Sequence, residues 1–207
     1  MQSTVFTIGH SIHDLSRFIS LLLQHEVTAL CDVRSQPYSR VNPQFNRECL
    51  KDALKQSGIA YVFLGKELGA RTDNRSCYEN GRVVYDRIAR TSLFAKGLDR
   101  IEDGLSKYRI SLMCAEKEPL NCHRTILVAR QVEKRGIPVS HIHADGTLET
   151  NEHAINRLIR SLSLPDMFLP QRELVAEAYR LQEDKIAYAP PDRTESTEPE
   201  IWERTAG

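Results

Sequence analysis

The sequence of 207 residues has no long apolar run, no excess of charge of either sign and a single tryptophan. No window of about 18 consecutive apolar residues is present, which argues against a membrane-spanning helix. The 28 basic side chains are balanced by 28 acidic ones, so the formal net charge is zero. A protein that holds nucleic acid through many phosphate contacts normally carries a basic excess. Composition therefore disfavours nucleic acid as a partner, leaves room only for a local basic patch, and says nothing of the oligomeric state.

The amino terminus, MQSTVFTIGHS, also lacks the basic, apolar and small-residue segments of a secretory signal. The five cysteines contain no C-x2-C pair and no regular spacing, which disfavours a structural zinc site and a disulfide framework. Reduced thiols in a cytoplasmic protein are the expectation that follows. The compact glycine-rich loop that thiol phosphatases place before an arginine is missing too, so phosphatase chemistry is not favoured.

What the sequence does have is a regular alternation of β-rich runs and amphipathic helices. Parallel strands need helical crossovers between them, so this order predicts a single α/β domain of three layers. Its sheet is expected to be mainly parallel, with about five strands. The predicted strands lie at residues 3–10, 27–34, 59–64, 109–114 and 137–143.

The α/β domain is expected to span residues 1–163, followed by a helical extension over 164–186. From residue 187 the chain is rich in proline, threonine and glutamate, which predicts a disordered tail over 187–207 with Trp202 inside it.

Two internal segments are less regular. The helical region over 83–108 is expected to break near Gly97 and Gly104. Residues 65–82 are polar and patternless, and connections of this length in compact domains are usually functional or disordered. A segment that closes over a substrate is the functional interpretation.

Every predicted strand ends in ionisable or small polar residues. If these residues served only to pack the core, neutral turn residues would be expected there. Ligands of open α/β sheets bind beyond the carboxyl ends of the strands, and the ends of parallel strands share one rim. Each case has a simpler explanation: a histidine that caps a helix, a structural Asp–Arg ion pair, or an exposed loop histidine. The joint occurrence favours a pocket. The residues concerned are His10, Ser11, Asp32, Arg34, Gly65, Cys114, Glu116 and His143.

The stretch LMCAEKEPLNCHR, residues 112–124, carries most of the reactive chemistry. Cys122, His123 and Arg124 fall at the expected start of a helix, where free N–H groups and nearby cations lower the pKa of a thiol. One interpretation is therefore a nucleophilic thiolate, with His10, His123 or His143 as its proton-transfer partner.

Two other interpretations remain open for the same stretch. Thiolates and imidazoles suit zinc or iron, so a metal site could use some of Cys114, Cys122, His10, His123 and His143. Alternatively, both thiols pack as small apolar groups, and Arg124 pairs with Glu116 or Asp32.

Five motifs in this order resemble those of the uncharacterised family called domain of unknown function 488 (DUF 488). They are TIGHS, DVRSQPYS followed by Phe45, YVFLGKELGA, LMCAEKEPLNCHR and HIHADG, between Thr7 and Gly146. Ala70 stands where the family commonly has a second glycine. The resemblance implies an α/β domain whose signature residues cluster, and it assigns them no roles. The implied signature residues are His10, Asp32, Arg34, Cys114, Glu116, Cys122, His123 and Arg124.

An enzyme that acts on a small anionic or nucleotide-like molecule is the favoured function, because binding alone does not require two thiols beside histidine and carboxylate. A thiol-dependent hydrolase or transferase is preferred slightly over a transition-metal enzyme, and a nucleotide- or nucleic-acid-binding module is the alternative outside catalysis. The catalytic candidates are Cys114, Cys122, His10, His123, Asp32 and Glu116. Substrate binding is expected from Arg34, Ser11, Arg124, Gly65 and His143. No metal is assigned firmly, and the candidate ligands of zinc or iron are His10, Cys114, Cys122 and His123.

Overall fold

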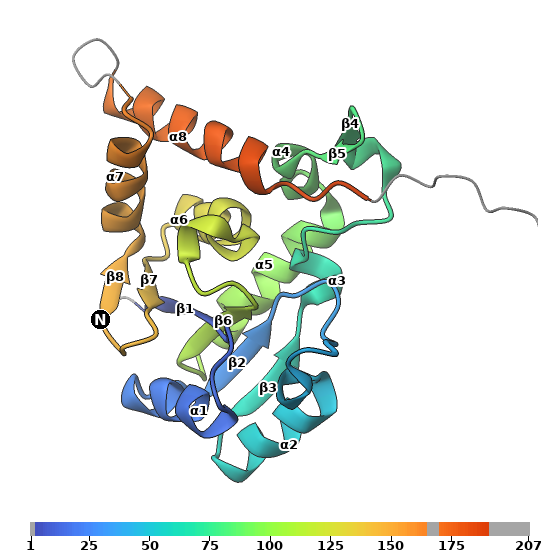
Figure 1. Cartoon of the computed structure of the whole chain (residues 1–207), viewed down its shortest axis with the longest axis vertical. Coiled ribbons are helices and arrows are strands. Elements are labelled where there is room, and N and C mark those ends of the chain that lie inside the picture. The colour runs from blue at the N-terminus through green and yellow to red at the C-terminus, as the bar shows by residue number, and fades with distance from the viewer. Residues whose placement is uncertain (1–2, 165–169, 191–207) are drawn as a thin grey trace, which may run out of the picture.

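The structure, a computed structural model, describes residues 3–164 and 170–190, and Figure 1 shows a central sheet with helices on both faces. Within these residues, six strands form the sheet in the order β3-β2-β6-β1-β7-β8. Their bounds are β1 Val5–Gly9, β2 Ala29–Asp32, β3 Ala60–Phe63, β6 Ile110–Cys114, β7 Val139–Ile142 and β8 Leu148–Thr150.

The pairings of β1, β2, β3, β6 and β7 are all parallel, which confirms the predicted α/β domain with a mainly parallel sheet. β8 pairs antiparallel with β7 at one edge. This strand is absent from the prediction because its three residues are too few to show an alternating pattern.

One face of the sheet is covered by α1 (Leu15–Gln24) and α2 (Arg47–Gln56). In α1 the apolar residues recur at helical spacing, so the helix buries one side and exposes the other. Phe18 and Leu22 of α1 accordingly belong to the same buried cluster as Phe6 of β1.

The opposite face is covered by the other helices, which share a larger apolar cluster with the sheet (Figure 1). The C-terminal helices α7 and α8 contribute buried residues to that cluster, so the predicted extension shares the core of the α/β domain. The bounds are α3 Gly65–Leu68, α4 Tyr85–Ala89, α5 Ser92–Gly104, α6 Arg130–Lys134, α7 Asn151–Ser161 and α8 Gln171–Ile186.

The predicted helix break near Gly97 is wrong, whereas the break at Gly104 is confirmed as the end of α5. The interruption lies instead at Thr91, whose Oγ1 accepts a hydrogen bond from the N–H of Phe94 at 3.2 Å and caps α5. A Cβ on Gly97 would lie 2.7 Å from the side chain of Leu68. The glycine therefore permits the close approach of α5 to α3 and does not end a helix.

The polar segment 65–82 is more regular than its composition indicates. After α3 it forms a 3-10 turn, η2 (Arg75–Cys77), and most of a two-stranded antiparallel ladder, β4 (Tyr78–Glu79) with β5 (Arg82–Val83).

The predicted tail starts directly after α8, yet its first residues pack against the domain. The N–H of Val83 donates to the carbonyl of Tyr188 at 3.0 Å, and the guanidinium of Arg71 lies 4.6 Å from the centre of the Tyr188 ring. Residues 191–207 of the predicted tail, and Trp202 with them, lie outside the described residues.

The segment after β6 winds in three different ways. A 3-10 turn, η3 (Pro119–Asn121), is followed by Cys122 and His123, then by a π-helix, η4 (Arg124–Ala129), and finally by α6. π-Helical turns are rare and occur frequently at functional sites. The two residues with the most reactive side chains thus lie at a change of winding.

The end of β6 lies at a topological switch point. β6 stands between β1 and β2 in the sheet. β1 and β2 lead to α1 and α2 on one face, whereas β6 leads to η4 and α6 on the other. Connections that diverge to opposite faces leave a crevice at the carboxyl ends of the strands, where ligands bind. The topology therefore directs attention to Cys114, the last residue of β6.

Candidate functional site

Main-chain hydrogen bonds hold the ends of three neighbouring strands together at this crevice. The N–H of His10, after β1, donates to the carbonyl of Cys114 at 2.9 Å, and the N–H of Val33, after β2, donates to that of Met113 at 3.1 Å. The loops after β1 and β2 consequently flank the end of β6, as the sequence predicts for a parallel sheet.

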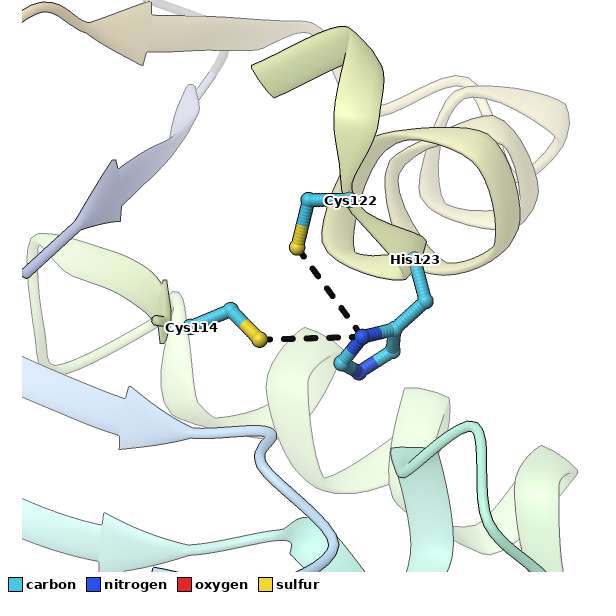
Figure 2. Close-up of side chains that lie close together, drawn as sticks. All are labelled: Cys114, Cys122 and His123. Carbon is cyan, nitrogen blue, oxygen red and sulfur yellow. Dashed lines mark hydrogen bonds between the residues drawn. The ribbon is translucent and has the colours of Figure 1, made fainter. Parts of the chain in front are cut away.

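Two thiols and an imidazole converge beside this strand end. The Sγ of Cys114 lies 3.6 Å from Nδ1 of His123, and the Sγ of Cys122 lies 3.9 Å from the same nitrogen. Figure 2 shows both sulfur atoms facing that nitrogen. One ligand atom from each residue lies within 4.8 Å of the other two, and both thiols are buried. We call these residues the thiol–imidazole cluster.

The orientation of the His123 ring is set from its other side. Nε2 lies 3.0 Å from the carbonyl oxygen of Val33. A carbonyl can only accept, so Nε2 carries a proton, and Nδ1 of the neutral ring presents its lone pair to the sulfurs. Burial by itself lowers the pKa of His123, but the hydrogen bond and negative charge of Cys122 outweigh it and raise the pKa above its usual range.

Glu116 places a carboxyl group beside the thiol–imidazole cluster. Its Oε2 lies 2.8 Å from the Sγ of Cys122. Burial raises the pKa of Glu116, and the charge of Cys122 raises it further. Burial alone would also raise the pKa of Cys122, but the hydrogen bond from Cys114 and the positive charge of Arg124 hold that pKa well below its usual range. Cys122 and Glu116 therefore share a proton that the carboxyl group holds more readily than an exposed glutamate does.

The two thiols differ in kind. The hydrogen bond of Cys114 to Cys122, together with burial, raises the pKa of Cys114 well above its usual range. Cys122 also accepts a hydrogen bond from the N–H of Arg124 at 3.4 Å. Of the two sulfur atoms, that of Cys122 carries the negative charge more easily.

Arg124 is buried beneath the cluster. Its Nη1 donates to the carbonyl of Glu116 at 2.6 Å, and its Nη2 donates to that of Lys117 at 3.3 Å. Its Nε has no hydrogen-bond partner among the described residues. A Cβ on Gly9 would lie 1.8 Å from the carbonyl oxygen of Glu116, so only glycine leaves room for the loop that Arg124 holds. Arg124 thus contacts main-chain oxygens, not the carboxylates of Glu116 or Asp32 that an ion pair would require.

Asp32 and Arg34 form a buried, two-pronged ion pair. Nε of Arg34 donates to Oδ1 of Asp32 at 2.9 Å, and Nη2 donates to Oδ2 at 2.7 Å. The hydroxyl of Tyr61 donates to the same Oδ2 at 2.8 Å. A carboxylate held this way fixes the guanidinium plane of Arg34.

His10 lies on the far side of that guanidinium. Its Nε2 is 3.3 Å from Nη1 of Arg34, and its Nδ1 lies 2.9 Å from the carbonyl of Ser11. The ring stacks on Phe45 with centroids 4.3 Å apart. Burial lowers the pKa of His10 to about 4, so the ring is neutral at pH 7. His10 is therefore oriented toward Arg34, apart from the thiol–imidazole cluster.

A cleft of about 280 Å³ opens above the cluster. Its lining includes all three residues of the cluster and Glu116, and Arg34 lies at its side. Tyr188, from the chain after α8, forms part of another wall. His10, Asp32 and Arg124 are buried behind this lining. His10 and Asp32 contact Arg34, and Arg124 contacts the main chain of Glu116, so they act on the cleft through these lining residues.

Three predicted substrate-binding residues lie elsewhere. Ser11 has a positive φ of 49° and contributes its carbonyl to His10. Gly65 begins α3, and a Cβ there would lie 2.0 Å from the carbonyl oxygen of Arg34. His143 contacts Glu149 of β8 at 3.0 Å. None of the three lines the cleft.

Several residues of the site carry no signal in the sequence. Val33 acts through a main-chain carbonyl, which no side chain reveals. Tyr85, a buried aromatic residue whose pKa is raised by burial, lines the cleft although it lies in a segment that reads as an ordinary helix. Tyr188 is hidden by the composition of the predicted tail. Tyr61, which supports Asp32, lies in a strand of apolar residues with no alternation that would single it out.

The fold and the site together define an α/β protein with a Cys/Cys/His cluster at the switch point of a parallel sheet. The chain belongs to the family described as domain of unknown function DUF488, whose family model matches residues 14–131, more than half of the chain. No curated protein and no solved structure matches the chain. Among the described residues, no helix has the length and apolar character needed to cross a membrane.

Proposed function

We propose that this protein is a zinc-dependent hydrolase that acts on a small anionic substrate, with the ion held by the thiol–imidazole cluster. The proposal rests on the distances from the sulfur atoms of Cys114 and Cys122 to Nδ1 of His123, 3.6 and 3.9 Å. Zinc binds sulfur at about 2.3 Å and imidazole nitrogen at about 2.0–2.1 Å, so tetrahedral geometry separates two such ligands by about 3.6 Å. The observed spacing is close to that of a ligand set around one ion.

The arrangement around His123 supports the same proposal. Metal-binding histidines almost always donate their second ring N–H to a carbonyl or carboxylate, and Nε2 of His123 donates to Val33. Three protein ligands are typical of catalytic zinc, because they leave a fourth position for water or substrate. The ion would supply Lewis-acid activation of water at that position.

Glu116 is suited to move the proton. A Cys/Cys/His ligand set beside a glutamate that is not a ligand is used for hydrolytic chemistry by zinc deaminases. Here burial, and after it the charge of Cys122, raises the pKa of Glu116 above its usual range, which suits a carboxyl group that accepts and returns a proton. Arg34, fixed by Asp32, lies at the side of the cleft, and of the two N–H groups of its Nη1 one faces His10 and the other is a donor for an anionic substrate group.

Metal analysis tests the proposal. The full chain, purified without chelator, is expected to contain about one zinc ion per molecule. Cys114→Ser, Cys122→Ser and His123→Ala should each remove most of it, whereas Cys49→Ser, which changes an exposed thiol, should leave the content unchanged. Less than about a tenth of an equivalent of zinc in the unaltered protein contradicts the proposal, and iron in its place changes the identity of the ion.

A thiol-dependent hydrolase or transferase is the second candidate, favoured by the contact of 2.8 Å between Cys122 and Glu116. Alkylation distinguishes the two. If the cluster holds zinc, iodoacetamide should modify Cys122 only after a chelator has removed the ion, while exposed Cys49 reacts in both cases. If the protein as purified contains no metal and its Cys122 is alkylated rapidly without chelator, the result would instead support the nucleophilic thiolate.

A further inference from the structure

A second hollow, of about 960 Å³, adjoins the cleft. It lies between the loop after β2, the segment from α3 to β5, and the chain after α8. Four residues line both the hollow and the cleft, so the two spaces are direct neighbours. They are Ser35, Gln36, Arg71 and Tyr188.

The hollow is basic. Its lining contains three arginines, Arg71, Arg75 and Arg82, and one acidic residue, Asp73. Within the described residues, none of these three arginines forms a salt bridge, whereas Arg87 on the neighbouring helix α4 pairs with a glutamate. The three arginines outnumber the one carboxylate and are not paired with it, so the hollow keeps a net positive charge, which favours an anionic ligand.

The side chain of Arg71 is already positioned at the junction with the cleft. Its Nη1 donates to Oε1 of Gln36 at 3.3 Å, and its guanidinium lies over the ring of Tyr188. Its main-chain N–H donates to Oγ of Ser35 at 3.0 Å. The contacts with Gln36 and Tyr188 are neutral, so they hold the guanidinium without cancelling its charge. A bound phosphate would consequently meet a largely ordered donor.

Aromatic side chains complete the lining. The hydroxyl of Tyr78 donates to the carbonyl of Thr72 at 2.8 Å, and the carbonyl of Tyr188 accepts from the N–H of Val83 at 3.0 Å. Each tyrosine is thus anchored at one point while its ring borders the hollow. Aromatic faces bind nucleobases by stacking with little sequence preference.

We propose that this hollow binds the phosphate and base of a nucleotide, and that Arg71 directs the reacting end of the molecule into the cleft. The volume suits this class, since pockets for small ligands measure about 300–1,000 Å³. The three arginines match the phosphates, and Tyr78 and Tyr188 match the base. The role given to the cleft rests on the proposed function, whereas nucleotide binding in the hollow does not require the metal.

Titration calorimetry with ADP as the probe tests the proposal on the full chain as purified. Arg71→Ala and Arg75→Ala should each weaken ADP binding by about tenfold, because each removes one charge-assisted contact. Arg160→Ala is the matched control. It removes the same charge from α7, outside the lining of the hollow, and should change the affinity by less than about twofold.

Two further ligands separate the contributions. Adenosine should bind at least about tenfold more weakly than ADP, and the affinity for ADP should fall as salt is added. Equal affinity for adenosine and ADP, or ADP binding that neither arginine variant weakens, overturns the proposal. Because a variant could lose its fold, its thermal midpoint is compared with that of the Arg160→Ala control.

The metal-binding proposal can fail independently. Cys114→Ser should lose zinc and retain ADP binding within about threefold, because Cys114 lines the cleft and not the hollow. If the unaltered chain contains no zinc but binds ADP as expected, the hydrolase proposal is wrong and the nucleotide site stands. If it contains zinc but does not bind ADP, the reverse holds.

Discussion

Two histidines on the same side of the sheet differ in burial, in partners and in pKa: His141 is buried, whereas His123 is half-buried. His123 has a carbonyl on one ring nitrogen and two thiols facing the other, and its pKa is raised. His141 has the hydroxyl of Thr7 at 2.8 Å and the amide oxygen of Asn151 at 3.1 Å, and burial lowers its pKa to about 4. Both nitrogens of the buried His141 ring have neutral hydrogen-bond partners. The His123 ring instead lines a cleft together with two thiols and the carboxyl group of Glu116.

The network around His141 extends further without opening a reactive site. The amide nitrogen of Asn151 donates to Glu133 at 2.5 Å and lies 3.0 Å from the hydroxyl of Tyr179. Each side-chain polar atom named in this hydrogen-bond network has a partner, as buried polar groups in stable proteins do. The contrast teaches that burial alone does not mark a functional histidine: the identity and charge of the partners do.

The two histidines should differ most in their effect on zinc affinity, measured after each ring is removed in turn. His123→Ala should lower the affinity by about a hundredfold or more, because one of three protein ligands is lost. His141→Ala should change it by less than about threefold. Competition with a chromogenic chelator supplies both numbers. A similar loss in the two variants would mean that the cluster does not hold the ion.

Stability should show the opposite ranking. His141→Ala leaves the hydroxyl of Thr7 and the amide of Asn151 buried without a shared partner and opens a cavity, so we expect a loss of about 3 kcal/mol in the free energy of unfolding. In metal-free protein, His123→Ala should cost about 1 kcal/mol, because its ring lies at the edge of the cleft. Urea unfolding followed by circular dichroism compares them. A larger cost for His123→Ala in metal-free protein would reverse the assignment of structural and functional roles.

The dependence of stability on pH should report the burial of the neutral His141 ring. The folded protein keeps His141 neutral down to about pH 4, while the unfolded chain takes up a proton near the ordinary pKa of 6.5. Protons therefore favour the unfolded chain, so the contribution of His141 is complete above the upper value and is lost as the pH falls toward the lower one. Between pH 7 and pH 5 this loss should reach about 2 kcal/mol.

The charged groups that act on His141 are Arg124 and His143, which oppose its protonation, and Glu149, which favours it. The control is His141→Gln, which keeps a hydrogen-bonding side chain without a titrating ring. The difference in unfolding free energy between the two proteins should shrink as the pH is lowered from 7 to 5. A difference that stays constant across this range shows that His141 does not titrate on unfolding.

The smallest expected effect comes from Thr7→Val, which removes one hydroxyl and keeps the shape of the side chain. We expect a loss of about 1 kcal/mol in stability, because the buried Nδ1 of His141 loses its partner. Zinc content should not change. Thermal unfolding together with metal analysis checks both statements, and a fall in zinc content here would connect two regions that the structure keeps apart.

The sequence predicts the fold and the part of the site that follows from strand topology or from a short separation along the chain. Strand–helix alternation sets the parallel sheet, and a parallel sheet brings Cys114 to the same rim as the loops after β1 and β2. Cys122 and His123 could be placed beside Cys114 because only a short loop separates them. These are local or topological consequences of pattern.

What the sequence does not predict depends on contacts between distant residues. His141 looks like an ordinary strand residue, since its partners Thr7 and Asn151 come from other elements. His10 was expected among the reacting groups, yet Arg34 and Phe45 hold it apart from the thiols. The distances that decide such roles arise only when the chain has folded.

The hydrogen bond that orients His123 ends on a main-chain oxygen, that of Val33, whose own N–H is fixed to Met113 across the sheet. Any residue that supports the strand supplies an identical acceptor there, so substitutions at this position cannot delete it. A substitution at position 33 therefore leaves the acceptor that orients the imidazole in place, whereas a shift in the register of β2 would move it.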